Sequence, residues 1–194
     1  TLNGRATAVT DSTGRTFEAK VIASSVDANL TFRKFLIDDV LPADFSRAVK
    51  HIDYSSATMK INLALSELPD FRCAPGTEVA PHHRGTIHIC DSVSWLEQAY
   101  DDAKYGRPSN QPILEITLPS SLDSTLAPPG KHVMNMFVQY TPYQLSGGKH
   151  WDDIKESYAD RCIDLLVEFA PNMRHAIEHR QVLSPLDLER TYGL

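Results

Sequence analysis

His82, His83 and His88 place three imidazole groups within seven residues. Imidazole binds transition metals and transfers protons near neutral pH. His82 and His83 follow Pro81 in a turn-rich stretch, whereas His88 lies in the alternating run GTIHIC, which is typical of a strand. Because no fourth ligand stands at a spacing typical of zinc sites, we predict no metal site.

Ser146, His132 and His150 could form part of a hydrolase site. Such a site also needs an acid partner and an oxyanion hole. The sequence contains no GxSxG motif, the turn that exposes a nucleophilic serine in many hydrolases. Hydrolase chemistry is therefore not predicted.

Glu115 is a charge inside the otherwise apolar run PILEITLP at 112–119. A charged side chain in such a strand must face solvent, a partner or a cavity, because burial without a partner is costly. The solvated face is the simplest interpretation, and a cavity wall is the functional one.

Strand and helix patterns alternate along the chain and predict an α+β fold. A hairpin is expected where 5–10 and 16–23 flank the turn DSTG, and each further strand shows β-branched residues or near-alternation. The further strands are expected at 55–65, 85–90, 112–119 and 131–140, and the helices at 42–52, 91–106, 150–170 and 184–193. These elements predict a mixed, mostly antiparallel sheet flanked by helices.

Charge and composition exclude several classes of partner. The formal net charge is −6, and the 19 Lys and Arg residues are scattered, so nucleic acid is not an expected ligand. The longest apolar stretch, 162–170, is interrupted by acidic residues and is too short to span a bilayer. The three cysteines form no CxxC pair, which favours packing roles in a reducing compartment.

Four segments carry a family resemblance: KINLALSELPDF, LPSSLDSTLAPPGKHV, FVQYTPYQLSGGK and SPLDLERTYGL. Together they resemble the phytoene-dehydrogenase and amine-oxidase group of FAD-dependent oxidoreductases, over nearly the whole chain. In that group a substrate domain is inserted between segments of a Rossmann-type FAD domain. The resemblance implies that residues 1–27 are a hairpin of the FAD domain and that 28–194 form the substrate-binding domain.

The resemblance also suggests where cofactor chemistry would take place. Lys60 resembles the lysine that amine oxidases place on a strand to hold water against the flavin N5, and it is the expected catalytic residue. An exposed strand lysine is the alternative. Ser24 and Ser25 end the second arm of the hairpin, where the chain of such proteins passes FAD, and they are the expected cofactor-binding residues.

A cluster of apolar residues is expected to contact the substrate. By analogy with the group, a small lipophilic substrate would lie over the flavin against Met134, Met136, Phe137, Tyr140 and Tyr143. Packing in the hydrophobic core is the alternative for at least half of them.

The nine glycines include no GxGxxG loop, which is the feature that brings backbone N–H groups close to a dinucleotide pyrophosphate. Gly147–Gly148 is only a doublet and is better explained as a loop-to-helix junction. We therefore expect FAD in a parent protein, where it would accept a hydride from a C–H or C–N bond. No cofactor and no activity are expected in this chain alone, and its start at Thr1 suggests an internal boundary.

The expected partners are a substrate and the remainder of the FAD domain, and an unpaired hairpin edge could also give a homo-oligomer. The compartment would be the cytoplasm of a bacterium or the mitochondrial matrix of a eukaryote. The alternative function is a non-catalytic ligand-binding or protein-interaction domain.

Overall fold

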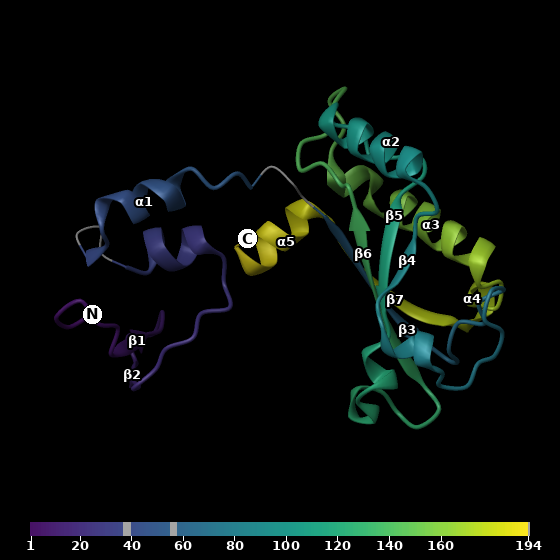
Figure 1. Cartoon of the computed structure of the whole chain (residues 1–194), viewed down its shortest axis with the longest axis horizontal. Helices are drawn as coiled ribbons and strands as arrows, with labels where there is room; N and C mark the ends of the chain where they lie inside the picture. Colours follow the sequence, from purple (N-terminus) through teal and green to yellow (C-terminus); the bar gives the residue numbers. More distant parts are fainter. Residues whose placement is uncertain (37–39, 55–57, 194) are drawn as a thin grey trace. The chain divides into compact units, whose positions relative to one another are not determined.

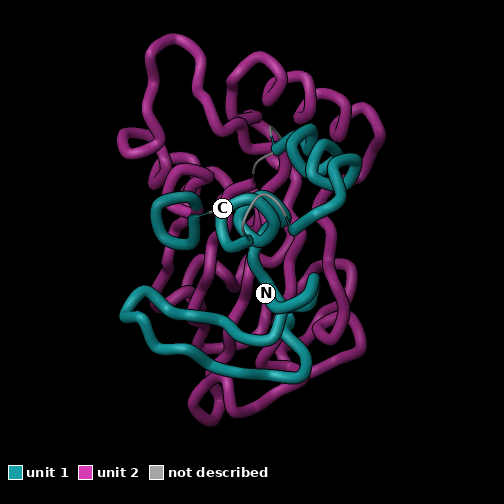
Figure 2. The backbone as a smooth tube through the Cα atoms, turned by 90° about the vertical axis from the view of Figure 1, so that its left-hand side faces the viewer, with its two compact units in different colours: residues 1–54, 189–194 teal, residues 55–188 magenta. Residues whose placement is uncertain are grey.

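The computed structural model describes residues 1–36, 40–54 and 58–193. The chain divides into two compact units, one formed by 1–54 with 189–194 and the other by 55–188 (Figure 2). The predicted boundary after residue 27, between a hairpin of the FAD domain and the substrate-binding domain, stays a prediction.

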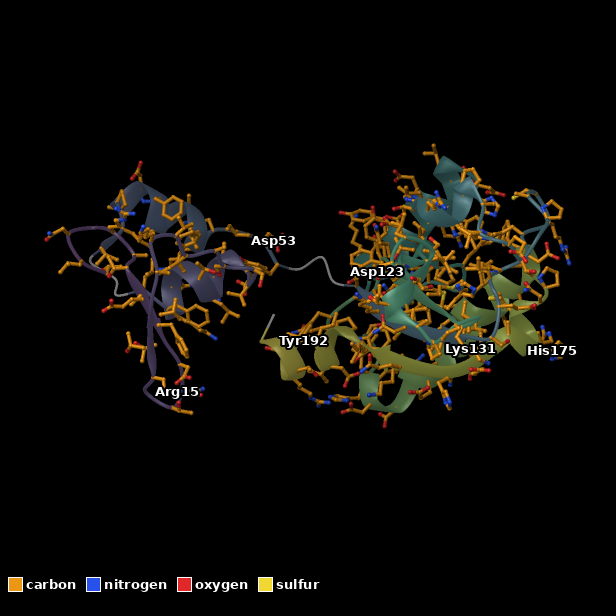
Figure 3. All side chains as sticks on the ribbon, turned by 90° about the horizontal axis from the view of Figure 1, so that it is seen from below. Arg15, Asp53, Asp123, Lys131, His175 and Tyr192 are labelled. Atoms are coloured by element: carbon orange, nitrogen blue, oxygen red, sulfur yellow. The ribbon has the colours of Figure 1, made fainter. Side chains whose placement is uncertain are left out.

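The first unit contains the hairpin that the DSTG turn predicts, although its strands are shorter than expected. Strand β1 (Ala8–Thr10) pairs antiparallel with β2 (Thr16–Glu18). Asp11 holds the turn because its carboxylate accepts hydrogen bonds from the backbone of Thr13 and from Arg15, which is labelled in Figure 3. The hydroxyl of Thr13 donates to Oδ1 of Asp11 as well, and this bond contributes most to lowering the pKa of Asp11.

Two short helices follow the hairpin in the first unit. The π-helix η1 (Leu30–Lys34) is not predicted by the sequence pattern, whereas α1 (Ala43–Lys50) lies within the predicted helix. The rings of Phe32 and Phe45 meet edge to face with centroids 5.0 Å apart. This aromatic contact joins η1 to α1.

The second unit is built on a five-stranded sheet with the order β4-β5-β6-β3-β7. Its strands are β3 (Met59–Leu65), β4 (Ile87–Ile89), β5 (Ile113–Thr117), β6 (His132–Gln139) and β7 (Ile177–Leu183). The α+β prediction is confirmed. Every pairing among the described strands is antiparallel, so the sheet has no parallel pair in that part of the chain.

One face of the sheet is buried under α2 (Val93–Lys104) and α3 (Trp151–Phe169) (Figure 1). Burial alternates strictly along β3, where every second residue from Met59 to Leu65 is buried. The helices contribute apolar side chains at helical spacing, including Trp95 from α2 and Leu166 from α3. The hydrophobic core of this unit therefore lies between the sheet and these two helices.

The segment 171–183 is absent from the predicted elements, yet it forms α4 (Met173–Ala176) and β7. Most of β7 is exposed, because it lies at the sheet edge beside β3. Its sequence IEHRQVL therefore lacks the apolar alternation that reveals a half-buried strand. The pairing with β3, which runs from Leu183 opposite Lys60, decides its structure instead.

Short helices complete the unit, and the last helix of the chain begins in it. The 3-10 helices are η3 (Pro81–Arg84), η4 (Pro119–Ser121) and η5 (Ser124–Leu126), and the last helix is α5 (Pro185–Tyr192). Among the described residues, no helix combines the length and apolar character needed to cross a bilayer.

Candidate functional site

A row of four side chains crosses the sheet on the face opposite α2 and α3. Lys60 of β3 pairs with Phe137 of β6, Phe137 pairs with Glu115 of β5, and Glu115 pairs with His88 of β4. Residues that lie directly opposite in neighbouring strands point to the same face of a sheet. The row therefore joins a lysine, an aromatic ring, a carboxylate and an imidazole on one surface.

A recess of about 270 Å³ lies over this row. It is lined by Lys60, Thr86, Glu115, Thr117, Asn135, Met136 and Phe137. The ring of Phe137 forms an apolar patch between the two charged side chains. Phe137 lies in the central strand β6, is paired with both Lys60 and Glu115, and is 42% exposed.

The two charges of the recess do not form an ion pair with each other. Within the described part of the chain, the Lys60 ammonium has neither a hydrogen-bond nor an ion-pair partner. The Glu115 carboxylate accepts a hydrogen bond from the amide of Gln139 through Oε1. A cation without a partner and a carboxylate bonded only to a neutral amide therefore stand on either side of Phe137.

A second polar row runs beside the first one. Thr117 pairs with Asn135, Asn135 with Asn62, and Asn62 with Gln181. The Asn62 amide nitrogen donates to Oε1 of Gln181 at 2.9 Å, whereas Oδ1 of Asn62 is buried and has no partner among the described residues. The open face of the sheet is thus predominantly polar around the Phe137 ring.

Lys60, the expected catalytic residue, lines this recess, and so does Phe137, one of the expected substrate-contacting residues. Ser24 and Ser25 are exposed in the first unit, and the Ser24 hydroxyl is hydrogen-bonded to that of Thr31 at 2.7 Å. Their predicted contact with FAD stays a prediction, as does the role of Lys60.

The expected substrate-contacting residues do not lie on one surface. Met134 and Met136 are fully buried in the core, although Met136 also borders the recess, whereas Phe137 faces the opposite side. This follows from the alternation of β6, in which even-numbered side chains face the helices. Tyr140 packs edge-on against Tyr100 at 5.3 Å, and Tyr143 is exposed. Substrate contact by these five residues stays a prediction.

His83 of the histidine pair in the loop makes structural contacts. His83 is fully buried; its Nδ1 accepts from the Ala80 backbone at 3.2 Å, and its Nε2 lies 3.2 Å from the Pro69 carbonyl. Burial lowers the pKa of His83, and the neutral ring that donates from Nε2 satisfies both partners. No group of three or more His, Cys, Asp or Glu side chains in the described ranges could hold a metal ion.

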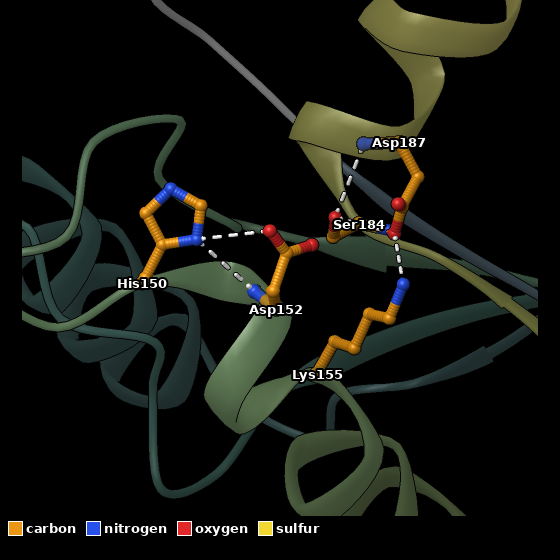
Figure 4. Close-up of polar contacts among 5 residues, drawn as sticks. All are labelled: His150, Asp152, Lys155, Ser184 and Asp187. Carbon is orange, nitrogen blue, oxygen red and sulfur yellow. Dashed lines mark hydrogen bonds and ion pairs between the residues drawn. The ribbon is translucent and has the colours of Figure 1, made fainter.

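In the described part of the chain, no hydrogen bond or ion pair joins Ser146, His132 and His150. His132 lies 3.4 Å from the hydroxyl of Ser120, and that hydroxyl also accepts a hydrogen bond from the Val133 backbone at 3.0 Å. His150 begins α3 and lies 3.2 Å from the carboxylate of Asp152 (Figure 4). Both histidines therefore have local structural contacts.

The glycine doublet is a loop feature. Gly147 and Gly148 both have positive φ, 69° and 68°, in the loop between β6 and α3. Neither glycine is part of a GxGxxG loop, the feature that brings backbone N–H groups close to a dinucleotide pyrophosphate.

The pyridine nucleotide-disulfide oxidoreductase domain-containing protein 2 of Mus musculus is 41% identical to the chain over 196 residues, which cover 98% of the chain and 34% of that protein. The protein of the same name from Rattus norvegicus is 40% identical over the same extent. The chain is a relative of these two proteins. It spans about one third of their length.

More distant similarity extends to an isomerase and a dehydrogenase. Chloroplastic prolycopene isomerase of Arabidopsis thaliana is 26% identical over 188 residues, covering 94% of the chain and 28% of that protein. Phytoene dehydrogenase of Streptomyces griseus is 29% identical over 101 residues, covering 51% of the chain and 20% of that protein. No family model matches the chain. The relatives agree with the resemblance to phytoene-dehydrogenase-like oxidoreductases that the four sequence segments indicate.

Proposed function

We propose that the chain is the substrate-binding part of a FAD-dependent oxidoreductase that takes a hydride from a C–H or C–N bond. The main support for this proposal is the position of the Lys60 ammonium. It has no partner among the described residues and faces a recess on the open side of the sheet. The similarity to an oxidoreductase-domain protein over 98% of the chain supports the same reaction class.

Lys60 would act beside the flavin in the complete enzyme. Its ammonium stands at the recess with Phe137 as its neighbour in β6, so a water molecule bound there could be held in place by an N–H donor. A docked cofactor would also desolvate Lys60 and so favour its neutral amine, which is the form that can accept a proton. Bound FAD would supply the hydride acceptor, and Lys60 would hold water or a proton next to it.

FAD itself would be held by residues of a longer protein. The described residues lack a glycine cradle, and the relatives extend well beyond the aligned third. This chain alone should therefore be colourless and inactive. The expectation of a lipophilic substrate comes from the family resemblance alone, whereas the recess places the ring of Phe137 between the charges of Lys60 and Glu115.

The proposal is tested in two steps. A visible spectrum of the purified chain should lack flavin absorption, whereas a protein that also contains the flanking segments should show it. In that longer protein Lys60→Met should slow flavin reoxidation by oxygen about tenfold or more, as expected when a positioned group is lost, at unchanged FAD content.

Lys104→Met provides the matched control, because Lys104 lies at the end of α2, outside the recess. It should reoxidise at the rate of the unaltered protein. If Lys60→Met behaves like this control, the role of Lys60 is wrong. A longer protein without flavin would instead favour the non-catalytic binding or interaction domain.

A further inference from the structure

We propose that the recess on the open sheet face binds a small dipolar molecule, with its anionic group at Lys60, its cationic group at Glu115 and its apolar middle on Phe137. The recess belongs to the site of the proposed function, and only the description of this ligand as a substrate rests on that function. The binding preference itself depends on side chains of the second unit alone.

The spacing of the charges defines the length of the ligand. Lys60 and Glu115 lie in the strands on either side of β6, so their backbones are separated by two strand spacings, roughly 10 Å. The two side chains form no ion pair with each other in the described structure. A ligand that contacts both therefore needs a spacer of several bonds between its two charged groups.

The hydrogen bonds that Lys60 and Glu115 leave open favour a ligand with one negative and one positive group. Gln139 donates to Oε1 of Glu115, which leaves Oε2 without a partner in the described ranges. An ammonium or amidinium group can donate to Oε2 and also lie near the Phe137 ring, where a cation is attracted to the aromatic face. A carboxylate at the other end would accept from Lys60.

The surroundings of the recess are suited to a short polar chain. Thr117 and Asn135 add neutral hydrogen-bonding groups to its wall. Its volume of about 270 Å³ is below that of typical drug-sized pockets, so the ligand is small. A long hydrocarbon would desolvate Lys60 and Glu115 without pairing either charge, which is unfavourable. This distinguishes the proposed ligand from a lipophilic one.

Binding of four six-carbon probes to the 194-residue chain tests the proposal. The probes are 6-aminohexanoate, hexanoate, hexylamine and hexanol, titrated at low salt while amide chemical shifts are followed by NMR. We expect saturable shifts at Lys60, Glu115 and Phe137, with 6-aminohexanoate binding at least tenfold more tightly than each of the others. Raising the salt concentration should weaken this binding, because the charges are solvent-accessible.

Two variants test the binding of the two charged ends of the ligand one at a time. Lys60→Met should make 6-aminohexanoate bind no better than hexylamine, and Glu115→Gln should make it bind no better than hexanoate. Lys104→Met is the control and should keep the full preference. Dispersed amide spectra establish folding for each variant, and the salt dependence of the unaltered chain tests the charges even where a variant does not fold.

The outcomes distinguish this inference from the proposed function. Equal binding of all four probes, tighter binding of hexanol, or no saturable shift in the recess overturns the dipolar ligand. A preference for 6-aminohexanoate together with a longer protein that binds no flavin supports the ligand and overturns the oxidoreductase. A flavin-containing enzyme whose isolated chain shows no dipolar preference overturns only the ligand.

Discussion

Ser184 and Asp187 bond to each other in both directions at the start of α5. The backbone N–H and the hydroxyl of Ser184 donate to Oδ2 of Asp187 at 3.0 and 2.7 Å, and the Asp187 N–H donates back to the Ser184 hydroxyl at 3.2 Å. Lys155 of α3 adds an ion pair to the same oxygen at 2.9 Å (Figure 4). The cap therefore also ties the beginning of α5 to α3.

Ser184→Ala should lower the free energy of unfolding by about 1 kcal/mol, because a side-chain cap at a helix start is lost. The measurement is urea unfolding followed by circular dichroism. Ser157→Ala is the control, since the Ser157 hydroxyl is exposed and bonds only within α3. Equal effects of the two substitutions would show that the cap contributes no stability.

The same cap should respond to acid. Burial raises the pKa of Asp187, but the bonds from Ser184 and Lys155 outweigh it and the net pKa is lowered below 3.8. A carboxyl whose pKa is lowered on folding stabilises the protein above its unfolded pKa. The difference between the unaltered chain and Asp187→Asn should therefore be constant near neutral pH and shrink below about pH 4.

His83 should make the chain less stable as the pH falls below neutrality. Burial lowers the pKa of His83 from 6.5, with smaller effects of its neighbours, so the unfolded chain takes up a proton that the folded chain does not. Burial lowers the pKa of His132 as well. The free energy of unfolding should fall as the pH decreases from 7 to 5.

Urea unfolding at several pH values tests this dependence on the two histidines. His83→Gln should flatten the slope between pH 7 and 5, and the double variant with His132→Asn should flatten it further. His51→Gln is the comparison, because His51 is exposed at the end of α1. A slope that His83→Gln leaves unchanged would contradict the prediction.

Met134 and Phe137 should differ in their effect on stability because they lie on opposite faces of β6. Met134→Ala removes a fully buried side chain from the core and should cost about 2–5 kcal/mol. Phe137→Ala removes a side chain that is partly in solvent, and it should cost clearly less. Similar losses in denaturant titrations would contradict the assignment of the two faces.

Cys162 should resist alkylation in the folded chain. Burial raises the pKa of the Cys162 thiol to about 12, and only the thiolate reacts. Cys73 is exposed. With iodoacetamide at pH 8, mass spectrometry should detect labelling of Cys73 first, and Cys73→Ser should remove the fast adduct. Labelling of Cys162 at the rate of Cys73 would show that the core opens readily.

The strand pattern predicts much of the recess from local sequence. Glu115 stands out as a charge in an apolar strand, and the structure places it on the recess wall. Lys60 stands out through the family resemblance and lies in the same recess. Alternation along β6 could also have separated Phe137 from Met134 and Met136, because adjacent positions of a strand face opposite sides.

The sequence alone determined which segments become strands and helices wherever apolar residues repeat with a regular period, and it determined the face that each strand residue takes. Only the tertiary structure decided that Lys60, Phe137 and Glu115 lie in one row. Strand register depends on how side chains from distant segments pack together, and no local pattern records it. For the same reason β7 could be recognised only through its hydrogen bonds to β3.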